Sequence, residues 1–174
     1  MPKIIENVKE KLLIEARKQV MEQGYSAMTI RSVAKACGVG VGTVYNYFDS
    51  KDMLVASFML TDWLRCMRNI QQFCEEEKQP PEVLKCVYDE LEYFIHQYKI
   101  LFQDKSAGAN FSAVVSQRHG LLRSQIAEPL RGICEKQKKA NTEFLSEFVA
   151  ESMLTWTVAG RNFEEISSIL LQLF

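Results

Sequence analysis

Apolar residues recur at helical spacing through almost the whole chain. Near its start, Ile5, Val8, Leu12, Ala16 and Val20 follow one another at intervals of three or four residues, the repeat of one helix face. Little of the sequence shows the alternation of apolar and polar residues that a half-buried strand requires. Only eight glycines and four prolines interrupt the 174 residues. We therefore expect an all-α fold of eight or nine helices without a sheet.

Glycine, proline and capping residues indicate where these helices begin and end. Gly24 is typical of the residue that follows a helix, so the first helix is predicted over residues 5–23. Thr29 is suited to cap a short second helix, and Asn162 is suited to cap the last one. The remaining predicted helices cover residues 41–48, 51–74, 82–102, two segments of 111–139 divided near Gly120 and Pro129, 142–159 and 163–173, with a linker over 75–81 and a loop over 104–110.

The composition is typical of a globular chain of the cytoplasm. Apolar residues make up 47% of the chain and charged residues 25%, which excludes a disordered protein. No uninterrupted apolar run approaches the roughly 20 residues that cross a bilayer, and the first residues do not resemble a signal peptide. The five cysteines are widely spaced without a C-x-x-C motif, which indicates reduced thiols. We expect a cytoplasmic protein without a membrane partner.

Charge is distributed unevenly along the chain. Residues 1–51 carry eight Lys or Arg and five Asp or Glu, a net charge of +3. Residues 52–174 carry thirteen and seventeen, a net charge of −4, and the two values sum to the −1 of the whole chain. A basic first segment on an acidic remainder favours a nucleic-acid contact near the N-terminus.

Residues 29–54 have the arrangement of a helix-turn-helix, two short helices joined by a glycine-containing turn. Eight residues of helix span about 12 Å, which matches the width of the DNA major groove. The spacing turns Val39, Val44 and Phe48 inward and leaves Val41, Gly42, Thr43, Tyr45 and Asn46 mostly outward. A solvated helix face usually carries Lys and Glu, so this glycine-containing, uncharged face indicates close approach to another molecule.

This segment resembles the DNA-binding domain of the TetR (tetracycline repressor) family of bacterial regulators. The resemblance covers about residues 5–55, and the family often has Ser or Thr where Gly40 stands and Ala where Cys37 stands. It implies a helix-turn-helix DNA-binding domain over residues 1–50 and a helical ligand-sensing and dimerisation domain over residues 51–174. The residues that carry the resemblance are Thr29, Val33-Ala34, Cys37-Gly38-Val39, Val44-Tyr45-Asn46-Tyr47-Phe48 and Lys51.

The resemblance also implies which residues contact DNA. Tyr45, Tyr47 and Lys51 are expected to contact phosphates, and Thr29 to present the second helix to the DNA backbone. Base edges are left to the third helix, with Arg31 as a further contact. The complete expected set is Thr29, Arg31, Val41, Gly42, Thr43, Tyr45, Asn46, Tyr47 and Lys51.

The resemblance implies a sequence-specific transcriptional regulator, a ligand-responsive repressor that binds a palindromic DNA operator as a homodimer. The last two predicted helices of the chain would pack against the same two helices of the partner subunit, because their apolar residues would form an exposed patch on a monomer. A small molecule of unknown identity would be the effector. The alternative from another class is an all-helical protein-binding or adaptor module that binds no operator.

Candidate ligand-binding residues are aromatic, methionine and histidine side chains within residues 51–174. Aromatic residues at helical spacing more often belong to the hydrophobic core. No catalytic residue, metal ligand or cofactor is expected, because the histidines lie outside any cluster with metal-ligand spacing. Thr43 also stands where a dinucleotide-binding fingerprint beginning at Gly38 would need its third glycine. The pocket candidates are Trp63, Met67, Tyr93, His96, Phe111 and Trp156.

Overall fold

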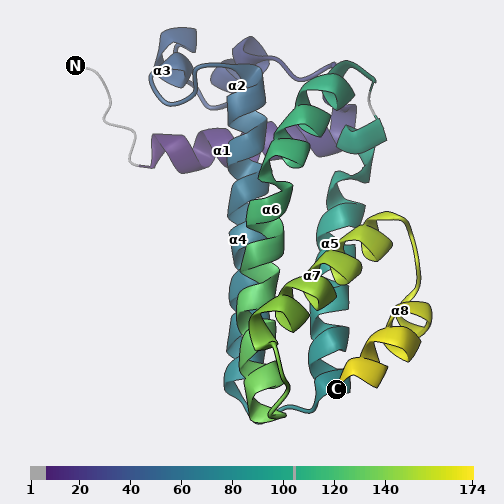
Figure 1. Ribbon diagram of the computed structural model, residues 1–174. Helices are drawn as coiled ribbons and strands as arrows, with labels where there is room; N and C mark the ends of the chain where they lie inside the picture. The colour runs from purple at the N-terminus through teal and green to yellow at the C-terminus, as the bar shows by residue number, and fades with distance from the viewer. Residues whose placement is uncertain (1–6, 104) are drawn as a thin grey trace. The chain divides into compact units, whose positions relative to one another are not determined.

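The structure is a computed structural model that describes residues 7–103 and 105–174, with side chains for all of these except 100 and 102–118. Over the described ranges the chain forms α-helices and one 3-10 helix and contains no strand (Figure 1). The predicted all-α class with eight or nine helices is confirmed. The helices are α1 (Val8–Gln23), α2 (Ile30–Ala36), α3 (Val41–Tyr45), α4 (Lys51–Glu75), α5 (Pro80–Gln103), α6 (Lys105–Lys136), α7 (Thr142–Val158), α8 (Phe163–Leu170) and η1 (Leu171–Leu173).

The predicted end of the first helix at Gln23 is confirmed, and residues 5 and 6 of its predicted start lie outside the described residues. Gly24 follows α1 with a φ of 86°, a backbone angle that glycine adopts without strain. The third helix is shorter than the predicted 41–48, because α3 ends at Tyr45. The amide of Tyr47 donates to the carbonyl of Val44 at 3.0 Å, three residues back, so the chain tightens into a turn before Phe48.

Two predictions at prolines are wrong. Helix α5 begins at Pro80 rather than at Glu82, because a proline in the first turn lacks only an N–H that has no helical partner there. Helix α6 continues through Gly120 and Pro129, where two helices were predicted, and it already covers residues 105–110 of the predicted loop. Residue 104 lies outside the described residues. Burial of Ile126 and Leu130, both 0% exposed, offsets the hydrogen bond that Pro129 removes.

The chain divides into two compact units. Unit 1 comprises Met1–Asp62 and Lys99–Ala113, and unit 2 comprises Trp63–Tyr98 and Val114–Phe174. The division therefore falls within helices α4, α5 and α6 rather than between two helices. A domain boundary at residue 50 stays a prediction.

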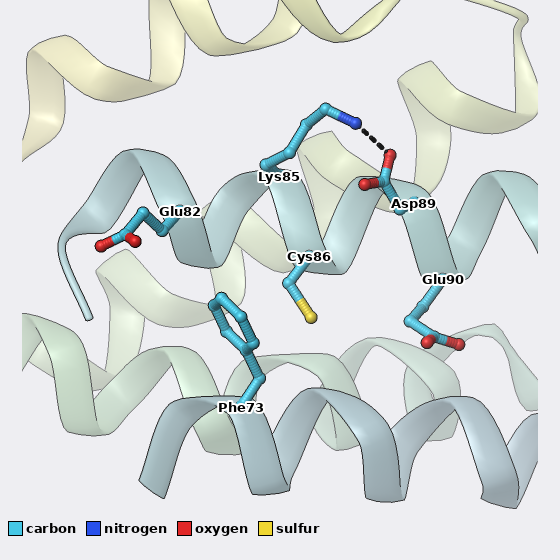
Figure 2. A pocket seen from close by; sticks show the side chains of 6 residues that line it. All are labelled: Phe73, Glu82, Lys85, Cys86, Asp89 and Glu90. Carbon is cyan, nitrogen blue, oxygen red and sulfur yellow. Dashed lines mark hydrogen bonds and ion pairs between the residues drawn. The ribbon is translucent and has the colours of Figure 1, made fainter. Parts of the chain in front are cut away.

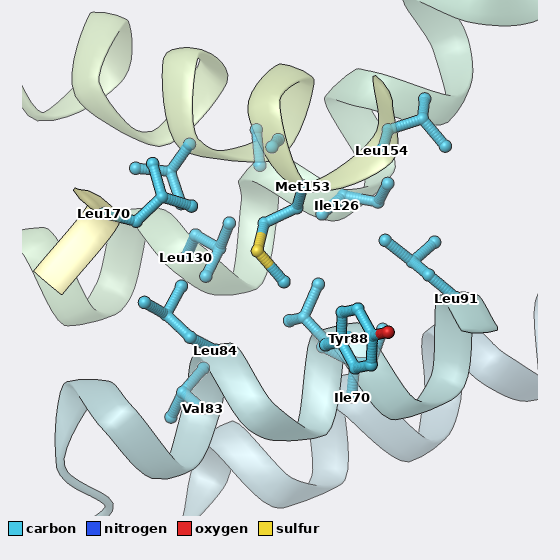
Figure 3. Packing of buried hydrophobic residues seen from close by; sticks show 14 of the residues in the cluster. Ile70, Val83, Leu84, Tyr88, Leu91, Ile126, Leu130, Met153, Leu154 and Leu170 are labelled. Carbon is cyan, nitrogen blue, oxygen red and sulfur yellow. The ribbon is translucent and has the colours of Figure 1, made fainter. Parts of the chain in front are cut away.

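The core of unit 2 is assembled from helices α4 to α8. Met153 of α7 points between Leu84 and Tyr88 of α5 on one side and Ile126 and Leu130 of α6 on the other (Figure 3). Met153 is 0% exposed, and the four residues around it are buried as well. Burial of these apolar side chains holds α7 and α8 against the rest of unit 2. The sides of α7 and α8 that face away from this core are therefore fixed in position.

Candidate nucleic-acid interface

Helix α3 packs against α2, and α2 in turn packs against α1. Val44 and Phe48 are 0% and 3% exposed, and they belong to the core of unit 1 with Leu12, Ala16 and Val33. This confirms that Val44 and Phe48 point inward, whereas Val39 is only half-buried. Buried side chains fix the rotation of a helix, so the opposite face of α3 is held outward.

The start of α2 is held by a network of side-chain hydrogen bonds. The Thr29 hydroxyl accepts from the Ser32 amide at 3.0 Å, and the Ser32 hydroxyl accepts from the Thr29 amide at 3.1 Å, so Thr29 is confirmed as the cap. The Ser32 hydroxyl also lies 2.6 Å from Oε1 of Gln19, and Nε2 of Gln19 donates to Glu15 at 2.8 Å. Gln19 is 6% exposed, so this network fastens α2 to α1 through a buried amide.

Replacing Thr29 with alanine is expected to lower the free energy of unfolding by about 1 kcal/mol, because the Ser32 amide loses its acceptor. Denaturant titration followed by circular dichroism measures this loss. Ser168→Ala serves as the control, since its hydroxyl bonds only to a carbonyl one turn back in α8 and caps no helix. An unchanged midpoint for Thr29→Ala would contradict the capping role.

Most of the predicted DNA-contacting residues are exposed on unit 1. Val41 is 37%, Tyr45 51% and Tyr47 46% exposed. Thr43 is half-buried. The other exposed members of the set are Thr29, Arg31, Gly42 and Asn46. The structure therefore brings these residues together on α2, on α3 and on the turn that follows α3.

Lys51 differs from the other members, because its ammonium group is engaged within the chain. Its Nζ donates to the carbonyl of Tyr25 and lies 4.0 Å from the centroid of the Tyr25 ring. The Tyr25 hydroxyl in turn donates to Asp52, and Tyr25 is 7% exposed. Tyr25 therefore ties the segment between α1 and α2 to the start of α4. Sequence reasoning missed this residue, which stands in what looks like an ordinary connection.

Comparison with known proteins identifies this part of the chain. Residues 12–58 match the family described as bacterial regulatory proteins of the tetR family. Residues 12–58 thus carry the sequence pattern of the TetR family. The HTH-type transcriptional regulator UidR of Escherichia coli K12 is 27% identical over 62 residues, which cover 36% of this chain and 32% of UidR. The chain thus spans about a third of the length of the curated relatives that head the comparison.

Solved structures resemble the fold over nearly the whole length of the chain. A TetR-family transcriptional regulator from Streptomyces coelicolor is 18% identical with a TM-score of 0.61, covering 95% of this chain and 99% of that one. FadR of Thermus thermophilus, a TetR-family repressor solved with lauroyl-CoA, is 21% identical with a TM-score of 0.64, covering 95% and 92%. At these identities the likeness shows a shared fold.

Of the predicted ligand-pocket residues whose side chains the structure describes, Trp156 alone lines either of the two hollows described below. Trp63 is 3% exposed in the core of unit 2, where Met67 also packs, and its indole N–H donates to Oε1 of Gln125 at 2.7 Å. Tyr93 is 44% exposed, and its hydroxyl accepts from Arg65 at 3.3 Å. His96 is exposed, and the side chain of Phe111 lies outside the described residues. These positions stay predictions.

Two open hollows lie on unit 2. The larger, about 440 Å³, lies between α4 and α5, where Phe73 and Cys86 point toward one another and Lys85 pairs with Asp89 (Figure 2). The smaller, about 350 Å³, includes Trp156 of the predicted set. Its other lining residues are Arg161, Glu165, Ile166 and Ile169, all from α8 or the segment before it.

Among the described residues no group of three or more His, Cys, Asp or Glu side chains could hold a metal ion. Burial, with smaller effects of Cys74 and nearby carboxylates, raises the pKa of the Cys86 thiol to about 11, so this thiol is protonated at neutral pH. In the described part of the chain no helix is long and apolar enough to cross a membrane.

Proposed function

We propose that the protein is a sequence-specific DNA-binding transcriptional regulator that places α3 in the major groove. The observation that carries this proposal is the exposed, uncharged face of α3, whose opposite side is buried through Val44. This helix lies within the segment that matches the tetR family. Tyr45 and Tyr47 present exposed hydroxyls from α3 and the turn after it, positions suited to phosphate contacts. The protein is proposed to act in the cytoplasm and to catalyse no reaction.

The outer faces of α7 and α8 support a homodimer as the form that binds DNA. Phe144, Phe148, Val158 and Ile169 are 72%, 47%, 61% and 54% exposed. The rings of Phe144 and Phe148 stack with centroids 6.4 Å apart, so these two side chains form one exposed apolar surface. Covering this surface with a second copy removes it from water, and a two-fold dimer reads a palindromic operator. Met153, Ile166 and Leu170 also belong to α7 and α8, but they are buried in the core of unit 2 and are not part of this exposed surface.

The proposed regulator is a repressor that a small molecule releases from its operator. A ligand that binds better to the form unable to bind DNA lowers operator affinity by that difference. FadR of Thermus thermophilus, which shares the fold, holds lauroyl-CoA. Acyl-CoA thioesters are therefore the first effectors to test, with free CoA as the control. Retained operator binding at saturating lauroyl-CoA would exclude this class of effector.

Fluorescence anisotropy with duplex DNA from immediately upstream of the gene tests the DNA-binding function. We expect saturable binding that weakens steeply as salt rises, since phosphate contacts release counterions. Tyr45→Phe and Tyr47→Phe together are expected to weaken binding roughly tenfold, because two hydroxyl contacts to phosphate are lost. Tyr93→Phe is the matched control, an exposed tyrosine on α5 that should bind as the unaltered chain does.

An adaptor protein gives the opposite result in this experiment. Its helix-turn-helix would be a scaffold only, so the unaltered chain would bind the duplex weakly and without sequence preference. The paired Tyr45 and Tyr47 variants would then match Tyr93→Phe. Lys51→Ala is a poor probe of this difference, because removing its ammonium group also breaks the contacts with Tyr25.

A further inference from the structure

The part of the candidate DNA-contacting surface that α3 and its two flanking turns supply carries no charged residue. No Lys, Arg, Asp or Glu occurs between Lys35 and Asp49, a stretch that contains all of α3 and both turns around it. Guanine is read most often by Arg or Lys, and the cytosine amino group by Asp or Glu. Helix α3 can offer neither contact. Val41 of α3 exposes an apolar group, which suits the methyl group of thymine, and Asn46, directly after α3, exposes an amide, which suits adenine.

Gly42 has no explanation within the chain. A Cβ atom added to Gly42 would meet nothing within 4 Å, so no neighbouring group requires its absence. The backbone angle does not require glycine either, since the glycines with positive φ are Gly24, Gly38 and Gly160. Within a helix, glycine is less favourable than alanine by up to about 1 kcal/mol. A bare backbone on an exposed face is useful when another molecule must approach it closely.

Val41 supplies the apolar group next to this bare position. It is the first residue of α3, immediately before Gly42, and its side chain is 37% exposed. Its β-branched side chain has few rotamers, so little conformational entropy is lost when it forms a contact. Side chains near the start of a recognition helix are the ones that reach base edges.

We propose that Gly42 and Val41 determine specificity by admitting a thymine methyl group against the start of α3. The operator half-site read by α3 is then defined by A·T pairs, with Asn46 suited to adenine in the same half-site. The bare backbone at Gly42 sets how closely α3 approaches the base edges, and the Val41 side chain packs on the methyl group. This inference rests on the proposed DNA-binding function and names the bases that α3 reads.

Replacing single thymines with deoxyuracil tests the base contact, because it removes the methyl group and leaves base pairing intact. The duplex is the tightest-binding site selected from a random pool. At one or more thymines in each half-site we expect deoxyuracil to weaken binding about fourfold, the value of one buried methyl group. Val41→Ala should weaken binding to the thymine duplex but cause no further loss with the deoxyuracil duplex. Equal binding at every deoxyuracil position would overturn the contact.

Gly42→Ala tests the close approach, with a matched control on α6. Gly132 is also helical and exposed, and a Cβ added there likewise meets nothing within 4 Å. Both alanine variants should keep or slightly raise the melting temperature, by about 2 °C or less. Gly42→Ala should weaken operator binding at least about tenfold, since its methyl group occupies the contact, and Gly132→Ala should bind normally. Unchanged operator binding by Gly42→Ala would overturn the assignment.

The outcomes separate this inference from the function on which it rests. If no duplex is selected by the unaltered chain, the DNA-binding function fails and the inference fails with it. If duplexes are selected but their half-sites are defined by G·C pairs, or tolerate deoxyuracil and Gly42→Ala, the function stands and the inference alone is wrong.

Discussion

Replacing Phe144 and Phe148 together with glutamate is expected to convert the protein to a monomer. The two rings are 72% and 47% exposed on α7, and a two-fold interface buries four such rings at once. Each buried phenylalanine contributes about 1.5–3 kcal/mol, and a buried carboxylate without a partner adds a further penalty. The dimer dissociation constant should rise at least about a thousandfold. Analytical ultracentrifugation measures it directly.

Leu60→Glu with Leu64→Glu is the matched control for that experiment. These leucines are 43% and 40% exposed on α4, and they test whether any loss of exposed apolar surface gives the same result. We expect this control to stay dimeric and the α7 variant to lose most of its affinity for a palindromic duplex. A dimeric Phe144 and Phe148 variant, or a monomeric control, would place the interface elsewhere.

Phe48→Ala is expected to abolish DNA binding and leave the dimer intact. Phe48 is 3% exposed beneath α3, and removing such a side chain from a core costs about 3–5 kcal/mol. That loss is large relative to the stability of a small domain, so the packing that holds α3 in position should be lost. Chemical denaturation, ultracentrifugation and operator binding on the same sample separate the three effects.

Tyr47→Ala distinguishes the loss of the packing that holds α3 from the loss of a single contact with DNA. Tyr47 precedes Phe48 in the chain but is 46% exposed, so its removal should change the stability by no more than about 0.5 kcal/mol. Operator binding should weaken without being abolished. If Phe48→Ala unfolds at the same denaturant concentration as the unaltered chain, then α3 does not depend on the packing of Phe48.

The helix-turn-helix was predictable because its signals are local. Thr29 forms its cap with a residue three positions away, and Val44 and Phe48 turn inward at the spacing of a helix. The same reasoning failed at Pro129, where the sequence shows a helix breaker. Packing of Ile126 and Leu130 against α5 and α7 decides the outcome there, and residues distant in the sequence supply that packing.

The candidate site was predictable in its position and less so in its contacts. Exposure of Val41 and Tyr45 follows from the period of α3. The engagement of Lys51 with Tyr25 does not, because 26 residues separate the two and no local pattern links them. Pocket residues were harder still, since an aromatic side chain such as Trp63 has the same helical spacing whether it fills a core or lines a cavity.

Selection of duplexes from a random pool by the unaltered chain is the most direct test of whether α3 reads DNA sequence. The account predicts enrichment of one inverted repeat, with identical half-sites because a two-fold dimer presents two copies of α3. Phe48→Ala should enrich nothing from the same pool. Selected sequences without a shared motif, or the same motif recovered by Phe48→Ala, would contradict the account.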